Sequence, residues 1–408
     1  MVTVFEEDLV IPEVIADPYA YYGRLREEDP VHWNDKYDTW VITRYDDLVW
    51  LIRNHEMFSS ALKNDPKPPY PEIYESDLEL YEVFKQFDGD MLNQQDRPAH
   101  LEMRKIVQGY FSPKSMEAWR PLVKSAIKDL LDAAEERGHM DVMRDFAGPL
   151  PVLVIAEMMG VPRQDRPYIR ELTEKLLHGG QGGGGEPDRM QVATQGFQGF
   201  CDLVNPLVDE RIDYARDDLI SVLAGGVKSG AFTRSQVLAT TSLLIVAGHE
   251  TTMNLICNGT LSFIRNPDQW ELFKQDPSGM TRGVTEECLR YDPPVKSLPR
   301  IASQDVEIGG KIIRKDDRVR WVMSSANRDP DKHENPDRFD IGRWPNTHVA
   351  FGSGIHHCLG ATLARLEAQE AFKALAERYG SINLDTDLVE YQPSITFRSI
   401  QSLPVSLS

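Results

Sequence analysis

The sequence predicts a mainly helical protein with small β-sheets, and three observations support this fold class. The 408 residues are 41% hydrophobic and 27% charged, an ordinary globular composition that can bury a large core. From Pro98 to about Ile264, apolar residues recur at the three- and four-residue spacing of amphipathic helices. Short runs rich in aromatic and β-branched residues, typical of strands, occur outside this region. Because no clean linker and no internal repeat divides the chain, we expect one large domain over residues 1–408.

Charge and cysteine content exclude several classes of protein. The chain has 45 Lys and Arg against 64 Asp and Glu, a net charge of −19, which disfavours binding to nucleic-acid phosphates. The four cysteines form no CxxC pair, so we expect free thiols in a reducing compartment. The acidic first eight residues match neither a secretory signal nor a membrane anchor. We therefore expect a cytoplasmic protein with no nucleic-acid partner and no membrane anchor.

The expected elements follow in chain order. Residues 31–45 predict a pair of strands joined by a turn at Asn34-Asp35. Residues 59–96 are acidic and Pro-rich, and we expect an irregular functional loop that roofs a site. The Gly-rich run 179–185 is either a flexible linker or a hinge between two lid helices. It is not a phosphate-binding loop, because it lacks the Gly-Lys-Ser/Thr ending of that motif. Three further segments complete the chain: strands over 305–322 around the hairpin dipeptide Gly309-Gly310, a helix over 359–379, and strand-like residues over 389–407.

A long helix is predicted over residues 235–265, with a span of about 45 Å at 1.5 Å per residue. Its apolar residues occupy several faces, which predicts burial, and its charged and amide groups argue against a membrane span. A buried carboxylate and hydroxyls are costly unless they are satisfied. In one interpretation, Thr251 and Thr252 donate hydrogen bonds to carbonyls one turn earlier, and Glu250 pairs elsewhere. In the other, Gly248 lets the helix open locally to a ligand or water, and Glu250 and Thr251 relay protons there.

The second informative segment is residues 351–360, Phe-Gly-Ser-Gly-Ile-His-His-Cys-Leu-Gly. A helix follows directly, so Cys358 lies at or just before a helix N-terminus, where free N–H groups and the helix dipole favour a thiolate. Gly352 and Gly354 allow a tight turn, and Gly360 keeps side-chain bulk away from the sulfur. A thiolate held by N–H donors with flat space beside it suits an axial ligand of haem iron.

Three other roles for Cys358 compete with haem ligation. The alternatives are a buried thiol, a nucleophile paired with His356 or His357, and a zinc ligand. Sequence neighbours rarely face each other and no nucleophile elbow is present, which disfavours the nucleophile. One Cys and two adjacent His do not supply tetrahedral ligand spacing, which disfavours zinc.

Residues 351–360 resemble the haem-binding loop of the cytochrome P-450 family, Phe-Gly-x-Gly-x-His-x-Cys-x-Gly, and fill every fixed position. Three further family patterns occur in the family's order: the oxygen-activating segment at Ala247-Gly-His-Glu-Thr-Thr, Glu-x-x-Arg at Glu287-Cys-Leu-Arg290, and Pro-x-Arg-Phe at Pro336-Asp-Arg-Phe339. The resemblance covers essentially the whole chain and fits the soluble bacterial members. It implies haem b (iron protoporphyrin IX) under a long central helix, with Cys358 as the metal ligand.

The resemblance also assigns roles to charged residues. It implies a buried structural lock that holds the haem loop, formed by Glu287, Arg290 and Arg338. The two haem propionates need cations or donors, and the resemblance implies four: His100, Arg104, Arg300 and His356. Without the resemblance, the four-residue spacing of His100 and Arg104 is also typical of a solvated face of an amphipathic helix.

The implied activity is monooxygenation, in which one atom of dioxygen enters a substrate C–H bond (hydroxylation) and the other leaves as water. Thr251 would hydrogen-bond oxygen and water above the haem, and Glu250 would renew the protons. Electrons would come from NAD(P)H through a reductase and a small acidic ferredoxin-type iron–sulfur protein that docks on the Cys358 side. A basic patch there, or scattered solvated charge, is formed by Arg104, Lys105, Arg343 and Arg365. A peroxide-dependent peroxygenase, an isomerase or a sensor of the same fold stays open.

The substrate pocket is expected where the long helix, the segment before Arg300 and the C-terminal turn meet. Its walls would be Leu243, Val246, Ala247, Ser297, Leu298, Thr396 and Phe397. Because most of these are apolar, we expect an apolar or amphipathic small molecule held mainly by burial. Residues 294–300 and 324–329 are similar to members acting on terpenoids and sterol-like molecules. Lys296 is either solvated or points inward to pair with a substrate carboxylate or phosphate.

Overall fold

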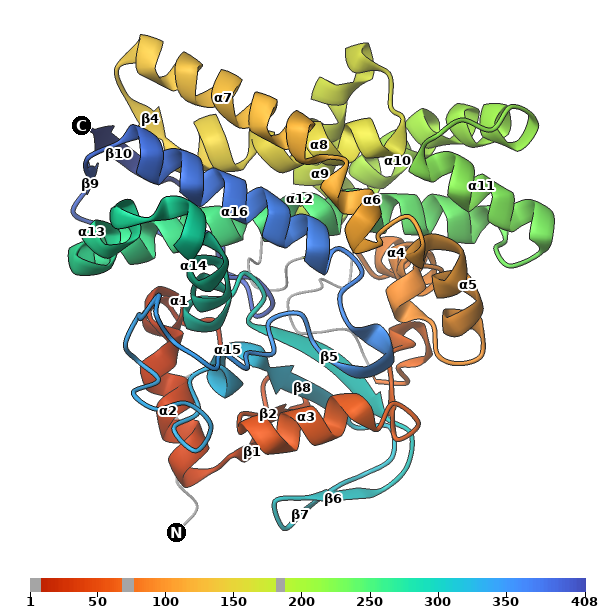
Figure 1. Cartoon of the computed structure of the whole chain (residues 1–408). Coiled ribbons are helices and arrows are strands. Elements are labelled where there is room, and N and C mark those ends of the chain that lie inside the picture. The colour runs from red at the N-terminus through yellow and green to blue at the C-terminus, as the bar shows by residue number, and fades with distance from the viewer. Residues whose placement is uncertain (1–8, 68–76, 181–187) are drawn as a thin grey trace.

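The structure is a computed structural model that describes residues 9–67, 77–180 and 188–408. Helices make up most of it, and the largest sheet lies at one side (Figure 1). The described helices are α1 (Pro12–Ala16), α2 (Pro18–Glu28), α3 (Tyr45–Arg53), α4 (Leu78–Gly89), α5 (Ala99–Gln108), α6 (Pro113–Glu117), α7 (Arg120–Arg137), α8 (Pro149–Met159), α9 (Arg166–Gly180), α10 (Arg189–Asp213), α11 (Leu219–Ser229), α12 (Arg234–Arg265), α13 (Pro267–Gln275), α14 (Pro277–Tyr291), α15 (Met323–Ala326) and α16 (Ala361–Arg378). Short 3₁₀ or π segments are η1 (Leu62–Asn64), η3 (Leu92–Gln94), η4 (Val142–Ala147), η5 (Arg163–Asp165) and η6 (Gly354–His356).

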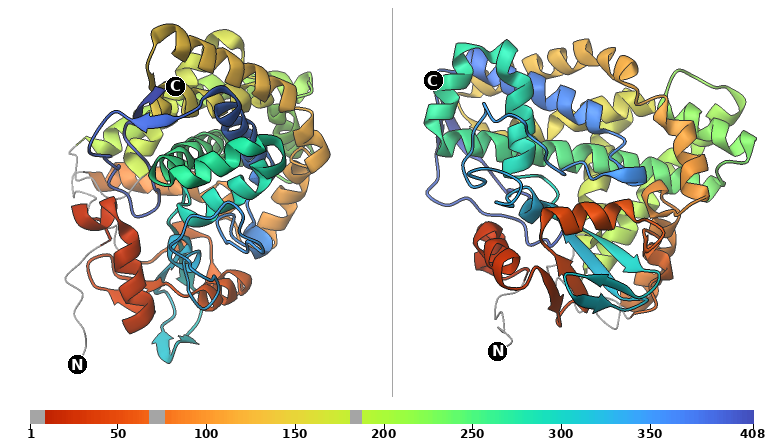
Figure 2. Two further views of the ribbon diagram at one scale, coloured as in Figure 1. Left: turned by 60° about the vertical axis from the view of Figure 1, so that its left-hand side comes forward. Right: turned by 60° about the horizontal axis from the view of Figure 1, so that its bottom comes forward.

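The strands form one five-stranded sheet and two smaller ones. They are β1 (Val31–Asn34), β2 (Thr39–Ile42), β3 (Phe58–Ser59), β4 (Met140–Asp141), β5 (Ser297–Ala302), β6 (Val306–Ile308), β7 (Lys311–Ile313), β8 (Arg318–Val322), β9 (Ile382–Leu384) and β10 (Pro404–Leu407). The main sheet has the order β1-β2-β8-β5-β3, with only β2 and β8 parallel among its described pairs. Helix α3 covers one face of it (Figure 2), where Leu48 and Leu51 join a buried cluster with Val319 and Trp321.

The strands predicted at residues 31–45 and around Gly309-Gly310 are confirmed. β1 and β2 pair antiparallel, with Val31 opposite Ile42. Gly309 and Gly310 join β6 to β7 with φ angles of 57° and 75°, the left-handed conformations of a two-residue hairpin turn.

The predicted long helix is α12, a 32-residue helix. Its start is fixed by a capping box, in which the Thr233 hydroxyl and the Gln236 side chain bond each other's backbone N–H groups. The helix is continuous through Gly248, so it does not open there as one interpretation expected. A Cβ at Gly248 would lie 3.4 Å from Cγ1 of Ile155, an ordinary van der Waals contact, so the packing against α8 does not require glycine at this position.

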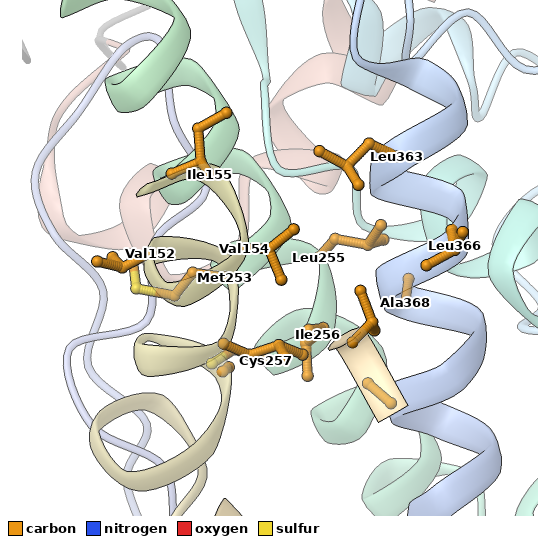
Figure 3. Packing of buried hydrophobic residues seen from close by; sticks show 14 of the residues in the cluster. Val152, Val154, Ile155, Met253, Leu255, Ile256, Cys257, Leu363, Leu366 and Ala368 are labelled. Carbon is orange, nitrogen blue, oxygen red and sulfur yellow. The ribbon is translucent and has the colours of Figure 1, made fainter. Parts of the chain in front are cut away.

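Helix α12 lies between α8 and α16 in the largest hydrophobic cluster (Figure 3). Val152 and Ile155 of α8 lie on one side of it, and Leu363 and Leu366 of α16 lie on the other. Ile256, between them, is 0% exposed. Burying a side chain of this size stabilises a fold by about 1.5–3 kcal/mol, so this packing fixes the position of α12. Within the described ranges, no helix is both long and apolar enough to cross a membrane.

The irregular loop expected over residues 59–96 is wrong in part. Residues 78–89 form α4, whose Phe87 ring packs on Phe197 of α10 with ring centroids 4.0 Å apart. The prolines and acidic residues before it obscured this amphipathic helix. Residues 68–76, within the same predicted loop, lie outside the described part of the chain.

Two other predictions are tested only in part. The Gly-rich run begins in α9, which ends at Gly180, and its residues 181–185 lie outside the described residues, so the hinge stays a prediction. The strand-like segment 389–407 contains one strand, β10, together with the isolated bridges Val295↔Phe397 and Tyr391↔Ile400.

Candidate active site

Glycines give the loop before α16 its shape. Gly352 and Gly354 have φ angles of 66° and 70°, which side chains disfavour. A Cβ at Gly354 would also lie 3.2 Å from the carbonyl oxygen of Ile52 in α3. The loop closes where the backbone N–H of Cys358 donates to the Phe351 carbonyl at 2.9 Å. Cys358 therefore lies in a tight turn two residues before the N-cap of α16, as predicted.

All four cysteines lie in the described part of the chain, and only Cys358 is exposed. Surrounding protein raises the pKa of its thiol above the ordinary value, while the N–H groups of Gly360 and Ala361, together with Arg104 and Arg365, act to lower it. These donors favour the thiolate, and a bound metal ion deprotonates a coordinating thiol. The cysteine is thus placed for ligation rather than for packing.

One face of α12 also borders open space. Ala247 is exposed and Thr251, one turn later, is half-buried, although the neighbouring Ile245 and Glu250 are at most 4% exposed. Helix α16, which starts just after Cys358, packs along α12 (Figure 1). A Cβ at Gly360 would meet no atom within 4 Å. Ala247, Cys358 and Gly360 are thus each left uncovered by neighbouring side chains, as the residues beside a flat ligand would be.

The four predicted propionate partners come together at the Cys358 loop. The rings of His100 (α5) and His356 have centroids 4.0 Å apart, and His356 Nε2 lies 3.0 Å from Ser60 Oγ. Arg104 donates to the His357 carbonyl at 2.6 Å. The guanidinium of Arg300 (β5) lies 5.7 Å from the Trp321 ring.

This group of donors has an excess of positive charge. Burial lowers the pKa of His100 to about 4, and Arg104 and Arg300 lower it further. Burial also lowers the pKa of Arg300 to about 10, and Asp96 only partly opposes this. His100 Nδ1 is buried without a hydrogen-bond partner among the described residues. Two carboxylates would satisfy such a set, so these residues fit haem with its propionates.

The predicted structural lock is present but is assembled differently. Glu287 and Arg290 are both 0% exposed and form a two-pronged ion pair, with both N···O distances 2.8 Å. Arg290 also donates to the carbonyls of Asn327, Pro336 and Arg338. It thereby ties α14 to the chain that leads into the Cys358 loop.

The prediction that Arg338 completes this lock holds for its backbone only. The Arg338 side chain is exposed, and the second guanidinium comes from Arg343, whose Nε lies 3.3 Å from Glu287 Oε2. Asn346 adds a bond of 3.0 Å to the same oxygen. Sequence reasoning missed both residues, because no spacing rule links a helix to a loop more than fifty residues later.

Glu250 and Thr251 each have defined partners. Thr251 Oγ1 donates to the Ala247 carbonyl at 2.6 Å, the back-bonded arrangement predicted as one alternative. Glu250 Oε1 accepts bonds from Ser399 Oγ at 2.6 Å and Asn254 Nδ2 at 3.0 Å. Ser399 comes from the C-terminal segment, which carries no local sequence signal for this contact.

Six of the seven predicted pocket residues are partly exposed although they lie on interior elements: Leu243, Val246, Ala247, Leu298, Thr396 and Phe397. Ser297 differs, because it is 2% exposed and its hydroxyl donates to the Ile395 carbonyl at 2.6 Å. Val295, which sequence reasoning missed, is half-buried and bridges to Phe397. Lys296 is 2% exposed, so its interpretation as a solvated lysine is wrong.

The predicted basic patch is not a set of free surface charges. Arg343 belongs to the lock, and Arg365 forms a two-pronged ion pair with Glu286 at 2.6 and 2.9 Å. Arg104 is half-buried against the Cys358 loop. Of the four, Lys105 is the exposed one.

Comparison with known proteins identifies the family. The Cytochrome P450 family model matches residues 279–385, which include the lock and the cysteine loop. The chain is 34% identical to the Polyketide biosynthesis cytochrome P450 PksS of Bacillus subtilis over 96% of both chains. It is similar to the crystal structure of P450BioI in complex with hexadec-9Z-enoic acid ligated acyl carrier protein (TM-score 0.88, 32% identity, 97% and 99% coverage). It also resembles CYP109E1 from Bacillus megaterium in complex with testosterone (TM-score 0.85, 30% identity, 97% and 99% coverage). The chain therefore belongs to the cytochrome P450 family of haem monooxygenases.

Proposed function

We propose that this enzyme hydroxylates an apolar or amphipathic small molecule, consuming one dioxygen, two electrons and two protons and releasing one water per C–H bond converted. Haem, ligated by Cys358 and held by His100, Arg104, Arg300 and His356, supplies the oxygen chemistry when bound. One observation carries the proposal: a hydroxyl and a carboxylate lie side by side on α12, on a turn where Ala247 is exposed and Thr251 is half-buried, and Cys358 is exposed as well.

In this proposal Thr251 and Glu250 divide the handling of protons. Thr251 uses its hydroxyl proton to bond the Ala247 carbonyl, so its oxygen is left to accept a bond from water. Glu250 is 4% exposed and anchored by Ser399, which keeps the carboxylate at one position next to the site. A carboxylate in reach of water is a proton donor and acceptor that renews the protons consumed.

The substrate class follows from the pocket and from the relatives. The pocket walls are mostly apolar, which favours burial of a largely apolar molecule. The named relatives act in polyketide biosynthesis or hold a fatty acyl chain or a steroid. We infer a substrate of this size and polarity, terpenoid and sterol-like molecules included.

The electrons are proposed to come from NAD(P)H through a reductase and a ferredoxin-type iron–sulfur protein docking near the Cys358 loop. The four free cysteines fit the reducing cytoplasm, where such donors operate. The test is turnover of a bound substrate under isotopically labelled dioxygen with ferredoxin, reductase and NADPH. The proposal expects one labelled oxygen atom per product. Product that forms only when unlabelled hydrogen peroxide is added, and that carries no label from dioxygen, would favour the peroxygenase alternative and contradict the proposal.

A further inference from the structure

Two buried cations near the expected substrate pocket form no ion pair with an acid among the described residues, although Asp292 lies close enough to Lys296 to raise its pKa. Lys296, just before β5, is 2% exposed and Arg320, in β8, is 3% exposed. Their cationic neighbours differ in this respect. Arg318 Nε bonds Asp65 at 2.6 Å, and Arg398 Nε bonds Asp292 at 3.3 Å.

Hydrogen bonds among three chain segments link the Arg320 guanidinium to the backbone of Lys296. Arg320 Nη1 donates to Ser297 Oγ at 3.1 Å and to Thr396 Oγ1 at 3.4 Å, while its Nε is buried without a hydrogen-bond partner in the described structure. The backbone N–H of Lys296 donates to the Thr396 carbonyl at 2.7 Å. The Arg320 guanidinium and two hydroxyls therefore meet beside the expected pocket wall, and Lys296, which is close enough for Arg320 to lower its pKa, lies in the same buried region.

Burying unpaired charge costs several kcal/mol, so such cations either neutralise or bind an anion. Burial lowers the pKa of Lys296 to about 7; Arg398 and Arg320 lower it further, and Asp292 opposes them. Arg320 cannot neutralise, because a guanidinium stays protonated in proteins. Its planar donors match the two oxygens of a carboxylate or phosphate.

We propose that Arg320 and Lys296 form a subsite for the anionic end of the substrate, a carboxylate or a phosphate monoester. This inference rests on the proposed function and narrows its substrate class to amphipathic acids. Thr396, which contacts Arg320, and Phe397 are half-buried residues of the expected pocket wall. An anion bound here leaves the apolar remainder of the molecule beside that wall.

The test measures the affinity of the haem-loaded enzyme for three probes with the same twelve-carbon chain: dodecanoate, dodecyl phosphate and neutral 1-dodecanol. Isothermal titration calorimetry gives each Kd without requiring turnover. We expect at least one of the anions to bind about tenfold or more tightly than the alcohol, since charged hydrogen bonds are among the strong ones. Dodecanoate as the tighter anion identifies a carboxylate subsite, and dodecyl phosphate identifies a phosphate subsite.

Arg320→Met should remove the preference for the anion and change the alcohol's Kd by less than about threefold. Lys296→Met should reduce the preference, and Lys315→Met, which alters an exposed lysine after β7, should leave it intact. If Arg320→Met does not fold, Arg320→Lys takes its place in the test. This variant keeps the positive charge, so it should retain part of the preference for the anion over the alcohol. Equal affinities for all three probes in the unaltered enzyme, or a preference that survives both Arg320→Met and Lys296→Met, would overturn the subsite. Those outcomes leave the proposed function standing as long as the same preparation shows thiolate-ligated haem.

Discussion

Replacing Arg343 by leucine should destabilise the enzyme, whereas the same change at Arg338 should not. The two arginines lie five residues apart in the same segment, and the family pattern pointed to Arg338. In the structure, the Arg343 side chain is 10% exposed and reaches the fully buried Glu287, while the Arg338 side chain is exposed. The pair therefore forms a matched test of which guanidinium completes the lock.

The expected magnitude follows from the contacts of Arg343. Besides Glu287 at 3.3 Å, it donates to the carbonyls of Glu334, Asn335 and Arg338 at 2.7, 3.1 and 3.3 Å. A hydrogen bond to a charged group contributes about 1.5–3 kcal/mol, and some of these carbonyls regain water, so we expect a loss of about 3 kcal/mol. At about 2.1 cal/mol/K per residue, 408 residues give an unfolding entropy near 0.9 kcal/mol/K, so Tm should fall by about 3 °C.

Differential scanning calorimetry of the haem-loaded variants, at two scan rates to detect irreversible unfolding, measures this difference. Arg338→Leu should shift Tm by less than about 1 °C, because changes at exposed positions stay within about 0.5 kcal/mol. Arg343→Lys should fall between, since it keeps the charge and loses the planar fork. Equal shifts for the two leucine variants, or a larger shift at Arg338, would refute the assignment.

Four further predictions concern the site. Thr251→Ala should keep the haem but divert electrons to peroxide, and full coupling of NADPH oxidation to product would refute the relay role. Ser399→Ala should remove one of the two hydrogen bonds to Glu250 Oε1 and leave that of Asn254, and coupled turnover should slow with a changed solvent isotope effect that a purely structural role would not give. Lys296→Met should stabilise the enzyme at pH 7 by about 4 kcal/mol, because the lysine pKa falls from 10.5 to about 7 on folding. Between pH 7 and 10.5 the unfolded state of the unaltered enzyme holds a proton on Lys296 that the folded state has lost, so the stability of the unaltered enzyme rises with pH. The stability gained by Lys296→Met should therefore shrink towards about pH 10. A stability gain that urea unfolding shows to be independent of pH would contradict this explanation. Lys105→Glu should slow reduction by ferredoxin at low salt, and salt-independent reduction would remove Lys105 from the docking surface.

Local patterns predicted the parts of the structure that depend on neighbouring residues. The spacing of glycines around Cys358 defines a turn that only a few φ angles permit, and the structure has that turn. The helical period of α12 and the Gly309-Gly310 dipeptide likewise act over a few residues. These elements were confirmed with boundaries within a few residues.

Contacts between distant segments account for what the sequence did not predict. Glu250 is anchored by Ser399, 149 residues later, and Arg320 reaches the Ser297 hydroxyl only because β5 pairs with β8. A lysine between apolar residues has the same local pattern whether it is solvated or buried. The single domain over residues 1–408 and the hinge at 179–185 stay predictions.

Ligation of haem iron by the Cys358 thiolate is the central claim, and the absorption spectrum of the reduced, carbon-monoxide-treated enzyme tests it most directly. We expect the strongly red-shifted Soret band that is typical of thiolate ligation, and we expect this band to be lost in Cys358→His. A Soret band at the position typical of histidine ligation in the unaltered enzyme, or a red-shifted band that persists in Cys358→His, would contradict it.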